Sequence, residues 1–277
     1  MIECKYWQTL FSRQSLLLAM IAVAGCNMPV SAELVAVDVL DVIKGATEYI
    51  QVSNISDEQE IEIGQQTNQQ ILEQYQLYDN SQVQQYVESL GQELISSSDS
   101  RDIPFVFQVV ASDEVNAFAT PGGFVYVTTG LLKTAENRAQ LASVMAHEIA
   151  HINNKHGVKG LKQAVAAKGI ANAAGVETSA LAQIAYQLTV DLPQSRSYEY
   201  EADSSGLKIL EQSGYPASAF ANFLAKLQST GGTPEFLRTH PSSDNRIAAI
   251  SPDGGDGNTS GKGLDPAEYQ SNVLDQL

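Results

Sequence analysis

The chain has 277 residues, of which 43% are hydrophobic, and it carries 32 acidic against 16 basic side chains for a formal net charge of −16. This hydrophobic content excludes an intrinsically disordered chain, and the length allows one large domain or two small ones. The acidic excess argues against nucleic acid and against an anionic membrane surface as partners, because both need Lys and Arg. No apolar run reaches the roughly 18 residues that a membrane-spanning helix requires.

Residues 1–25 have the pattern of a signal peptide of the bacterial lipoprotein type. A weakly basic start is followed by an apolar run over 16–25 that ends at Cys26, and this ending resembles a lipobox. The resemblance implies that Cys26 is acylated, and Asn27 behind it favours the outer membrane by the sorting habits of enteric bacteria. The protein is therefore expected in the periplasm, anchored to the membrane by a lipid. Cleavage after Ala32 is the alternative, and it would release a soluble secreted protein.

The first half of the mature chain is predicted to contain two helices and two strands. Residues 26–55 are expected to form a tether with little structure. The capping box Ser56-Asp57-Glu58-Gln59 then begins a helix that runs to about residue 78. The following elements are a helix with apolar residues at helical spacing over 81–97 and β-rich runs over 105–110 and 124–128.

The second half is predicted to be almost entirely helical. Helices are expected over 134–153 with Thr134 as N-cap, over 161–188 with internal breaks, and over 195–213, 216–227 and 242–250. Five Gly in 253–263 mark a flexible linker, so residues 253–277 are expected to form a flexible tail. Helices on both sides of a small antiparallel sheet or hairpin predict an α+β fold, with one mostly helical domain over 56–252.

One pentapeptide carries recognisable chemistry. His147-Glu148-Ile149-Ala150-His151 matches the pattern HExxH inside a predicted helix. Residues four apart share a helical face, so His147 and His151 can present two imidazoles to one zinc ion. Glu148 would lie beside the metal and can move a proton of its bound water. The alternatives are two histidines buried in the core and a zinc site that serves structure or peptide binding without turnover.

The third zinc ligand is expected to be a carboxylate from a later helix. A metzincin would need Gly and His where this chain has Asn154 and Gly157, so that class is excluded. Glu199 and Asp203 are four residues apart in a later predicted helix and share a face. Glu199 can therefore bind zinc while Asp203 accepts a hydrogen bond from a ligand imidazole. Glu201 lies about 200° around the helix from Glu199 and is expected to face water.

Three further residues are candidates for the surroundings of the metal. His156 is about 140° around the helix from His151, so we expect it to end the helix or to contact a ligand rather than bind metal. His240, which precedes Pro241, either lines the cleft, occupies the open zinc position in a resting state, or is only a turn residue. Arg246 either orients a carboxylate or polarises a substrate carbonyl, and an ordinary surface ion pair is the alternative.

The segment Asn116-Ala117-Phe118-Ala119-Thr120-Pro121-Gly122-Gly123 is a candidate for substrate binding. Pro121, Gly122 and Gly123 supply turn chemistry before the strand predicted over 124–128. The segment is either a plain hairpin or an edge strand that pairs with the backbone of an extended peptide. The second interpretation suits a protease that reads unfolded chains.

Together these motifs resemble the zinc metallopeptidase family of the HtpX heat-shock proteases, the CAAX prenyl proteases and the mitochondrial Oma protease, which is peptidase family 48 of the metallo class. The resemblance covers about residues 55–252. It rests on the segment 116–123, on His147 to His156, on Glu199-x-x-Ala202-Asp203, and on Thr239-His240-Pro241 with Arg246. It implies a zincin-like fold and a gluzincin site, with one zinc ion per chain on His147, His151 and Glu199 and with Glu148 as the catalytic acid and base.

The chain resembles the periplasmic lipoprotein branch of this family, because the membrane-spanning helices of some members and the tetratricopeptide repeats of others are not found in it. The branch implies a zinc-dependent endopeptidase that hydrolyses peptide bonds in damaged or misassembled envelope proteins. The alternative is a periplasmic chaperone or assembly factor whose zinc site is latent. No nucleic-acid partner is expected.

Overall fold

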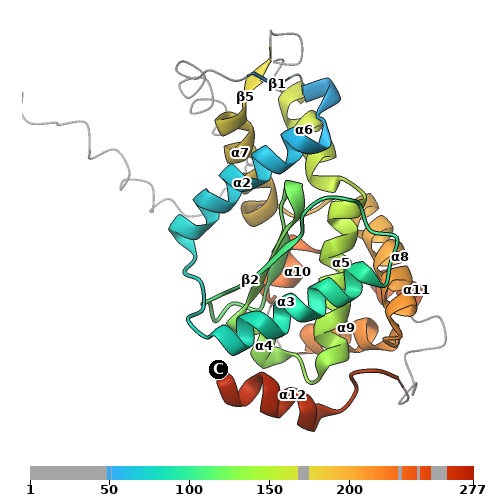
Figure 1. Ribbon diagram of the computed structural model, residues 1–277. Helices are drawn as coiled ribbons and strands as arrows, with labels where there is room; N and C mark the ends of the chain where they lie inside the picture. The colour runs from blue at the N-terminus through green and yellow to red at the C-terminus, as the bar shows by residue number, and fades with distance from the viewer. Residues whose placement is uncertain (1–48, 51, 168–174, 230–232, 242–243, 251–260) are drawn as a thin grey trace, which may run out of the picture.

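The computed structural model describes residues 49–50, 52–167, 175–229, 233–241, 244–250 and 261–277 (Figure 1). Within these ranges, helices surround a small three-stranded sheet, which confirms the expected α+β, mostly helical fold. The predicted signal peptide, Cys26 and most of the predicted tether lie outside the described residues. Among the described residues, none of the helices combines the length and hydropathy that crossing a membrane would require.

The elements follow one another in this order: β1 (Tyr49–Ile50), η1 (Val52–Asn54), α2 (Asp57–Gln74), α3 (Ser81–Ser96), β2 (Val106–Val110), β3 (Ala117–Ala119), η2 (Pro121–Gly123), β4 (Phe124–Thr128), α4 (Thr129–Thr134), α5 (Arg138–Asn153), α6 (His156–Ala167), β5 (Val176–Glu177), α7 (Thr178–Tyr186), η3 (Gln187–Asp191), α8 (Arg196–Ser213), α9 (Ser218–Ser229), α10 (Glu235–Thr239), α11 (Asp244–Ile250), α12 (Pro266–Asn272) and η4 (Leu274–Gln276). The predicted capping box is present at the start of α2, where Ser56 and Gln59 bond to each other's backbone amides.

The sheet is mixed, with the strand order β2-β4-β3. β3 and β4 form the expected antiparallel pair, but β2 runs parallel to β4, with Val106 opposite Phe124. Strand β3 lies at the far edge and runs opposite to β2. The chain then turns back into β4, which lies between β2 and β3, so β4 runs in the direction of β2. The prediction of a purely antiparallel sheet therefore holds only for the β3–β4 pair.

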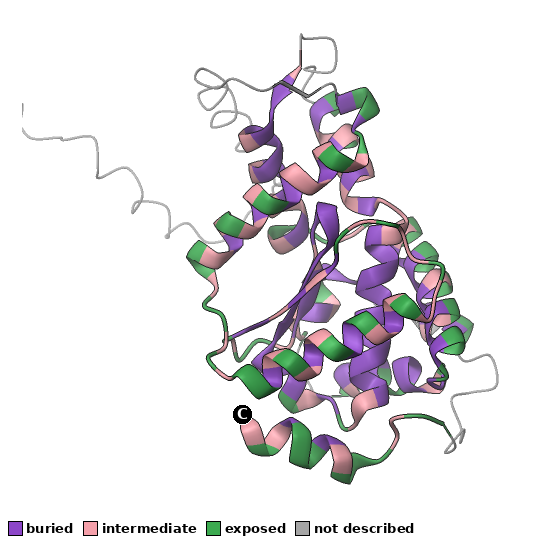
Figure 2. Ribbon diagram, in the orientation of Figure 1, coloured by how far each residue is buried: buried purple, intermediate pink, exposed green. Residues whose placement is uncertain are grey.

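The two faces of the sheet are both buried (Figure 2). One face packs against α3 and α5 in the large core, which includes Val109, Val125 and Val127. The other face packs toward the end of α2 and toward η3 through Phe118 and Tyr126. Strand β3, at the edge of this sheet, is thereby held beside α5.

Helix α5 is the centre of the molecule, and every residue from Ala139 to Ile152 is buried (Figure 2). It begins after Asn137, whose side chain accepts a hydrogen bond from the amide of Gln140 at 2.9 Å. The predicted N-cap at Thr134 is wrong, because Thr134 ends the short helix α4 and an extended Ala135 separates the two helices. A helix that is buried on all sides can hold polar side chains only where they find partners.

A second, smaller core lies at the end of the molecule where α6, α7 and the strand pair β1–β5 meet (Figure 1). Val52 and Ile55 are buried in it, against Val165 and Leu181. The prediction that the tether continues to residue 55 is therefore wrong for 49–50 and 52–55, which are part of the folded domain. Short apolar segments of this kind gain their structure from tertiary contacts, which local sequence patterns do not reveal.

The expected flexible tail is wrong for residues 261–277. They form α12 and η4, which pack on the large core through Tyr269 and Val273, both fully buried. The hydroxyl of Tyr269 donates a hydrogen bond to the carbonyl of Leu132 at 2.8 Å. The apolar pattern of this helix consists of only two residues four apart, which is too short to predict a helix from the sequence next to a glycine-rich run.

Candidate metal centre

Three elements bring four side chains together that can bind a metal. α5 supplies His147 and His151, α8 supplies Glu199 from its first turn, and the segment after α10 supplies His240. All four are buried, and one ligand atom from each lies within 4.8 Å of the others. The structure thus brings the three predicted ligands together and adds a third imidazole to them.

The spacing of the ligand atoms fits a tetrahedral metal ion. Nε2 of His147 lies 3.1 Å from Nε2 of His151 and 3.5 Å from Oε2 of Glu199. Nε2 of His151 lies 3.4 Å from Oε1 of Glu199. Ligands held about 2.05 Å from one ion at tetrahedral corners lie roughly 3.3 Å apart. Imidazole and carboxylate are also donors that zinc binds readily, so the residues present fit a zinc ion.

The environment of the cluster keeps Glu199 ionised. Burial acts against its charge, but the imidazoles of His240, His147 and His151 hold the pKa of Glu199 well below its usual value. Burial also acts against a charged His147, yet the carboxylates of Asp203 and Glu199 raise its pKa to about 9. For His151, burial lowers the pKa to about 3. The carboxylates therefore favour a positive charge among the imidazoles, and a metal cation would supply that charge in exchange for the proton of His147.

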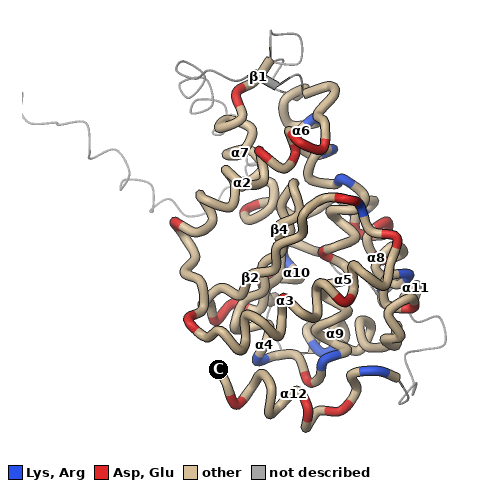
Figure 3. The backbone as a smooth tube through the Cα atoms, in the orientation of Figure 1, with Lys and Arg blue, Asp and Glu red and all other residues tan. Residues whose placement is uncertain are grey.

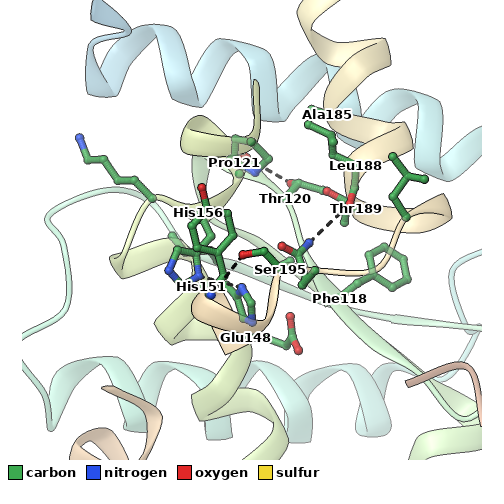
Figure 4. A pocket seen from close by; sticks show the side chains of 18 of the residues that line it. Phe118, Thr120, Pro121, Glu148, His151, His156, Ala185, Leu188, Thr189 and Ser195 are labelled. Carbon is green, nitrogen blue, oxygen red and sulfur yellow. Dashed lines mark hydrogen bonds between the residues drawn. The ribbon is translucent and has the colours of Figure 1, made fainter. Parts of the chain in front are cut away.

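Glu148 lies beside this cluster and faces the adjacent cavity (Figure 4). Its side chain is 1% exposed, and Oε1 lies 3.4 Å from Nε2 of His240. Burial raises the pKa of Glu148. A carboxylate with a raised pKa is suited to accept a proton and to release it again near neutral pH.

Asp203 and Arg246 hold the ligands in place from behind. Oδ1 of Asp203 lies 3.1 Å from Nδ1 of His147. Arg246 donates two hydrogen bonds to Asp203, both of 2.7 Å, and its Nη1 lies 2.7 Å from Oε2 of Glu199. Nη1 also donates to the carbonyl of Pro241 at 3.0 Å, which ties the turn after His240 to the same place. Arg246 is 1% exposed, so it is not a surface ion pair.

His156 contacts the far side of His151. Its Nδ1 lies 3.0 Å from Nδ1 of His151, and its Nε2 lies 3.2 Å from Oε2 of Glu201. Its ring stacks on Tyr198 with centroids 4.4 Å apart. Burial lowers the pKa of His156. His156 is therefore one contact removed from the cluster, while the exposed Glu201 caps it from the solvent side.

A cavity of about 250 Å³ opens next to Glu148 and His151. Figure 4 shows Ala185, Leu188 and Thr189 across the cavity from the histidines. The wall between them is formed by α6, by the segment 192–195 and by the residues before β4. The cavity therefore offers a largely apolar space directly beside the residues that could perform chemistry.

The predicted substrate-binding segment lies at this cavity, as the edge strand β3 and the turn η2. The amide of Thr120 and the carbonyl of Asn116 bond to β4. Hydrogen-bonded pairs alternate in an antiparallel ladder, so the backbone groups of Ala117 and Ala119 point away from β4. Ala117 is fully buried, so Ala119, which lines the cavity, is the residue with which an extended peptide could pair.

Only part of the segment reaches the cavity. Phe118, Ala119, Thr120 and Pro121 line it. Asn116 and Ala117 are buried at the start of the strand, and Gly122 and Gly123 form the turn, with φ of 80° and 100°. A Cβ at Gly122 would lie 2.7 Å from the carbonyl oxygen of Glu60, so the turn depends on a close approach to α2.

Sequence reasoning missed two features that position the site. A Cβ at Gly206 would lie 3.2 Å from Cα of His147, so this glycine lets α8 approach the metal-binding helix. The signal was available, because Gly206 follows Glu199 by seven residues and shares its helical face. Arg101 binds Glu60 at 2.9 and 2.7 Å and the carbonyl of Ile152 at 3.0 Å, which ties α2 to the end of α5. No local pattern indicates this second contact.

Comparison with known proteins supports the same chemistry. A family model described as "Peptidase family M48" matches residues 81–252. The "Beta-barrel assembly-enhancing protease" of Escherichia coli (strain K12) is 32% identical in an alignment of 213 positions, and the match covers 71% of this chain and 44% of that protein. The "Mitochondrial metalloendopeptidase OMA1" of Schizosaccharomyces pombe is 30% identical in an alignment of 172 positions, and the match covers 60% of this chain and 51% of that protein. The matched part thus spans about half the length of these relatives.

Proposed function

This chain belongs to peptidase family M48, and from that premise we propose that it is a zinc-dependent endopeptidase of the bacterial cell envelope. The observation that carries the proposal is the buried cluster of His147, His151 and Glu199 with Glu148 beside it at the wall of a cavity. Its substrates are damaged or misassembled envelope proteins, whose unfolded segments present extended backbone. The printed name of the Escherichia coli relative supports an envelope role.

The proposed reaction is hydrolysis of a peptide bond. His147, His151 and Glu199 would hold a zinc ion, whose chemistry would be that of a Lewis acid toward the scissile carbonyl and toward a water molecule. Glu148 takes a proton from the attacking water and then passes it to the leaving amine. Asp203, fixed by two hydrogen bonds from Arg246, keeps the ring of His147 in one orientation.

The substrate is placed by the edge of the sheet and by the cavity. The backbone of an extended peptide pairs with Ala119 of β3, which lines the cavity, and this brings its scissile bond past Glu148. One side chain of the peptide enters the cavity toward Leu188 and Ala185, where apolar groups are favoured because they leave water. Such recognition reads main chain and apolar side chains, both of which folded proteins conceal.

The test of the proposal is a Glu148→Gln variant. Purified wild-type protein should bind one zinc ion and cleave an unfolded polypeptide, whereas Glu148→Gln should keep the zinc and lose cleavage by at least about a hundredfold. Glu199→Gln should lose most of the zinc, and Glu211→Gln, an exposed position on the same helix, should match the wild type. Unchanged cleavage by Glu148→Gln would reject the peptidase mechanism. Suppression of aggregation by a wild type that cleaves nothing would establish the chaperone alternative.

We further propose that Cys26 is acylated and tethers the enzyme to the outer membrane from the periplasmic side. The apolar run over 16–25 and the lipobox-like ending support this location. Cells grown with labelled palmitate should yield labelled wild-type protein, and Cys26→Ala should appear unlabelled, in the soluble or unprocessed fraction. A wild-type chain that never carries the label would favour cleavage after Ala32 instead.

A further inference from the structure

A continuous line of contacts runs from the metal cluster to the surface of α8. It begins at His151, passes through the buried ring of His156 and ends at the exposed carboxylate of Glu201, with separations of 3.0 and 3.2 Å. Nε2 of His151 faces the other ligands, so its Nδ1 is the atom that faces His156. Both nitrogens of His156 are therefore engaged, one on each side.

The direction of each hydrogen bond follows if His151 binds zinc, as the proposed function requires. A neutral imidazole that binds a metal through Nε2 carries its proton on Nδ1, so His151 is the donor and Nδ1 of His156 the acceptor. A neutral His156 that accepts at Nδ1 carries its own proton on Nε2. That proton points at Oε2 of Glu201, and a carboxylate accepts it.

We propose that His156 and Glu201 are positioning residues that orient His151 for zinc through this line of hydrogen bonds. The other ligand imidazole, His147, has a carboxylate directly behind it in Asp203. For His151 the corresponding carboxylate is that of Glu201, and the imidazole of His156 lies between the two. Contacts of this kind fix the tautomer and the orientation of a ligand ring and strengthen its hold on the metal.

The surroundings hold both positioning residues in place. Tyr198 stacks on His156 with an angle of 11° between the rings, and the hydroxyl of Tyr198 accepts a hydrogen bond from Gln163 at 2.9 Å. Nζ of Lys159 lies 3.4 Å from both carboxylate oxygens of Glu201. Glu201 is thus aimed at His156, although sequence reasoning placed it in water without a role.

Zinc affinity, measured by competition with a chromophoric chelator, tests the proposal with two substitutions of one residue. His156→Phe keeps the ring stacked on Tyr198 but has no acceptor, and it should weaken zinc binding by about 10- to 100-fold. His156→Gln can accept from His151 and donate to Glu201, and it should stay within about threefold of the wild type. Wild-type affinity in His156→Phe would overturn the proposal. Weak binding in both variants would mean that the ring itself, rather than the hydrogen bonds, is needed, and would overturn it as well.

The part played by Glu201 has its own comparison. Glu201→Ala should weaken zinc binding in the same assay, whereas the exposed Glu211→Ala on the same helix should not. Nitrogen NMR of the zinc-loaded wild type should show His156 protonated on Nε2 alone. Protonation of His156 on Nδ1, or wild-type zinc affinity in Glu201→Ala, would reject the proposed role of Glu201 as a positioning residue. Failure of the wild type to bind zinc would instead reject the proposed function, so the two failures are distinguishable.

Discussion

His240 lies between two carboxylates with different tasks. Its Nδ1 is 3.2 Å from Oε1 of the proposed ligand Glu199, and its Nε2 is 3.4 Å from Oε1 of the proposed proton carrier Glu148. The ring stacks on Phe236, with centroids 4.7 Å apart, and the carbonyl of Pro241 accepts from Arg246. The imidazole thus supplies a fourth candidate ligand atom beside His147, His151 and Glu199, at the place where the proposed mechanism needs a water.

Replacement of His240 by Ala should therefore raise the basal cleavage of an unfolded substrate several-fold. Bound zinc should stay the same, because the ligands His147, His151 and Glu199 remain. The measurements are initial rates with a quenched fluorescent polypeptide and metal content of the same samples. A loss of activity would identify His240 as a donor to the transition state, and wild-type rates would leave it as a turn residue only.

At this scale local spacing predicts which of the candidate site residues lie together, as the structure has them. His147, Glu148 and His151 follow from one turn of helix, and Glu199 with Asp203 follows from another. The burial of Arg246 could not be predicted, and for His240 the open zinc position was one of three alternatives, because both placements depend on how the segment from α10 to α11 folds back over α8. Contacts between residues more than 40 positions apart produce no periodic pattern in the sequence.

Helix α6 forms one wall of the cavity. Gly160 lines the cavity from this helix, and a Cβ there would meet only Cδ1 of Leu188, at 3.3 Å. A larger side chain at this position would therefore project into the space that the proposed substrate side chain uses. The proposed zinc ligands and the proposed proton carrier Glu148 lie on other helices than α6.

Gly160→Leu should change selectivity without removing chemistry. Cleavage of peptides with a large aliphatic residue beside the scissile bond should fall by roughly tenfold or more relative to peptides with Ala there. The zinc content should not change. Gly160→Ala is the control, and it should keep the wild-type preference while the helix gains up to about 1 kcal/mol in propensity. A peptide library read by mass spectrometry measures the preference, and an unchanged profile in Gly160→Leu would exclude the cavity as the subsite.

Element boundaries show where local signals stop being sufficient. The caps at Ser56 and Ser195 are side chains that accept from their own helices, and both starts were predicted. The start of α5 was placed at Thr134 although Asn137 is the cap, because both residue types suit the position and only packing separates them. The parallel pairing of β2 with β4 likewise depends on the crossover between them.

On the scale of the whole molecule, charged pairs join the C-terminal segment to the large core. Acidic positions outnumber basic ones along the chain (Figure 3), yet Glu93 of α3 is paired with Arg138 at 3.0 Å and with Lys262. Burial acts to raise the pKa of Glu93, but hydrogen bonds from Lys262, Tyr215 and Arg138 outweigh it and lower the pKa below its usual value.

This shift predicts a contribution to stability that acid removes. A carboxyl group whose pKa is lowered by folding stabilises the fold above its unfolded pKa, near 4.5, and the effect is lost as pH falls through the folded pKa. In urea unfolding, Glu93→Gln should be less stable than the wild type at pH 7, and the difference should shrink below about pH 4.5. Glu211→Gln should differ little from the wild type at either pH. A constant deficit of Glu93→Gln at all pH values would contradict the assignment.

The two separate cores have a consequence for how such enzymes diverge. The helices α5 and α8, which carry the proposed ligands, belong to the large core, whereas Ala164, Ala185 and Leu188 of the opposite cavity wall belong to the small core or pack against it. Substitutions in the part of the small core that α7 supplies can therefore accumulate without moving a ligand, whereas α6 also carries His156, which contacts His151. Proteins that descend from one ancestral chain can therefore diverge in substrate preference while the proposed ligands and Glu148 stay the same.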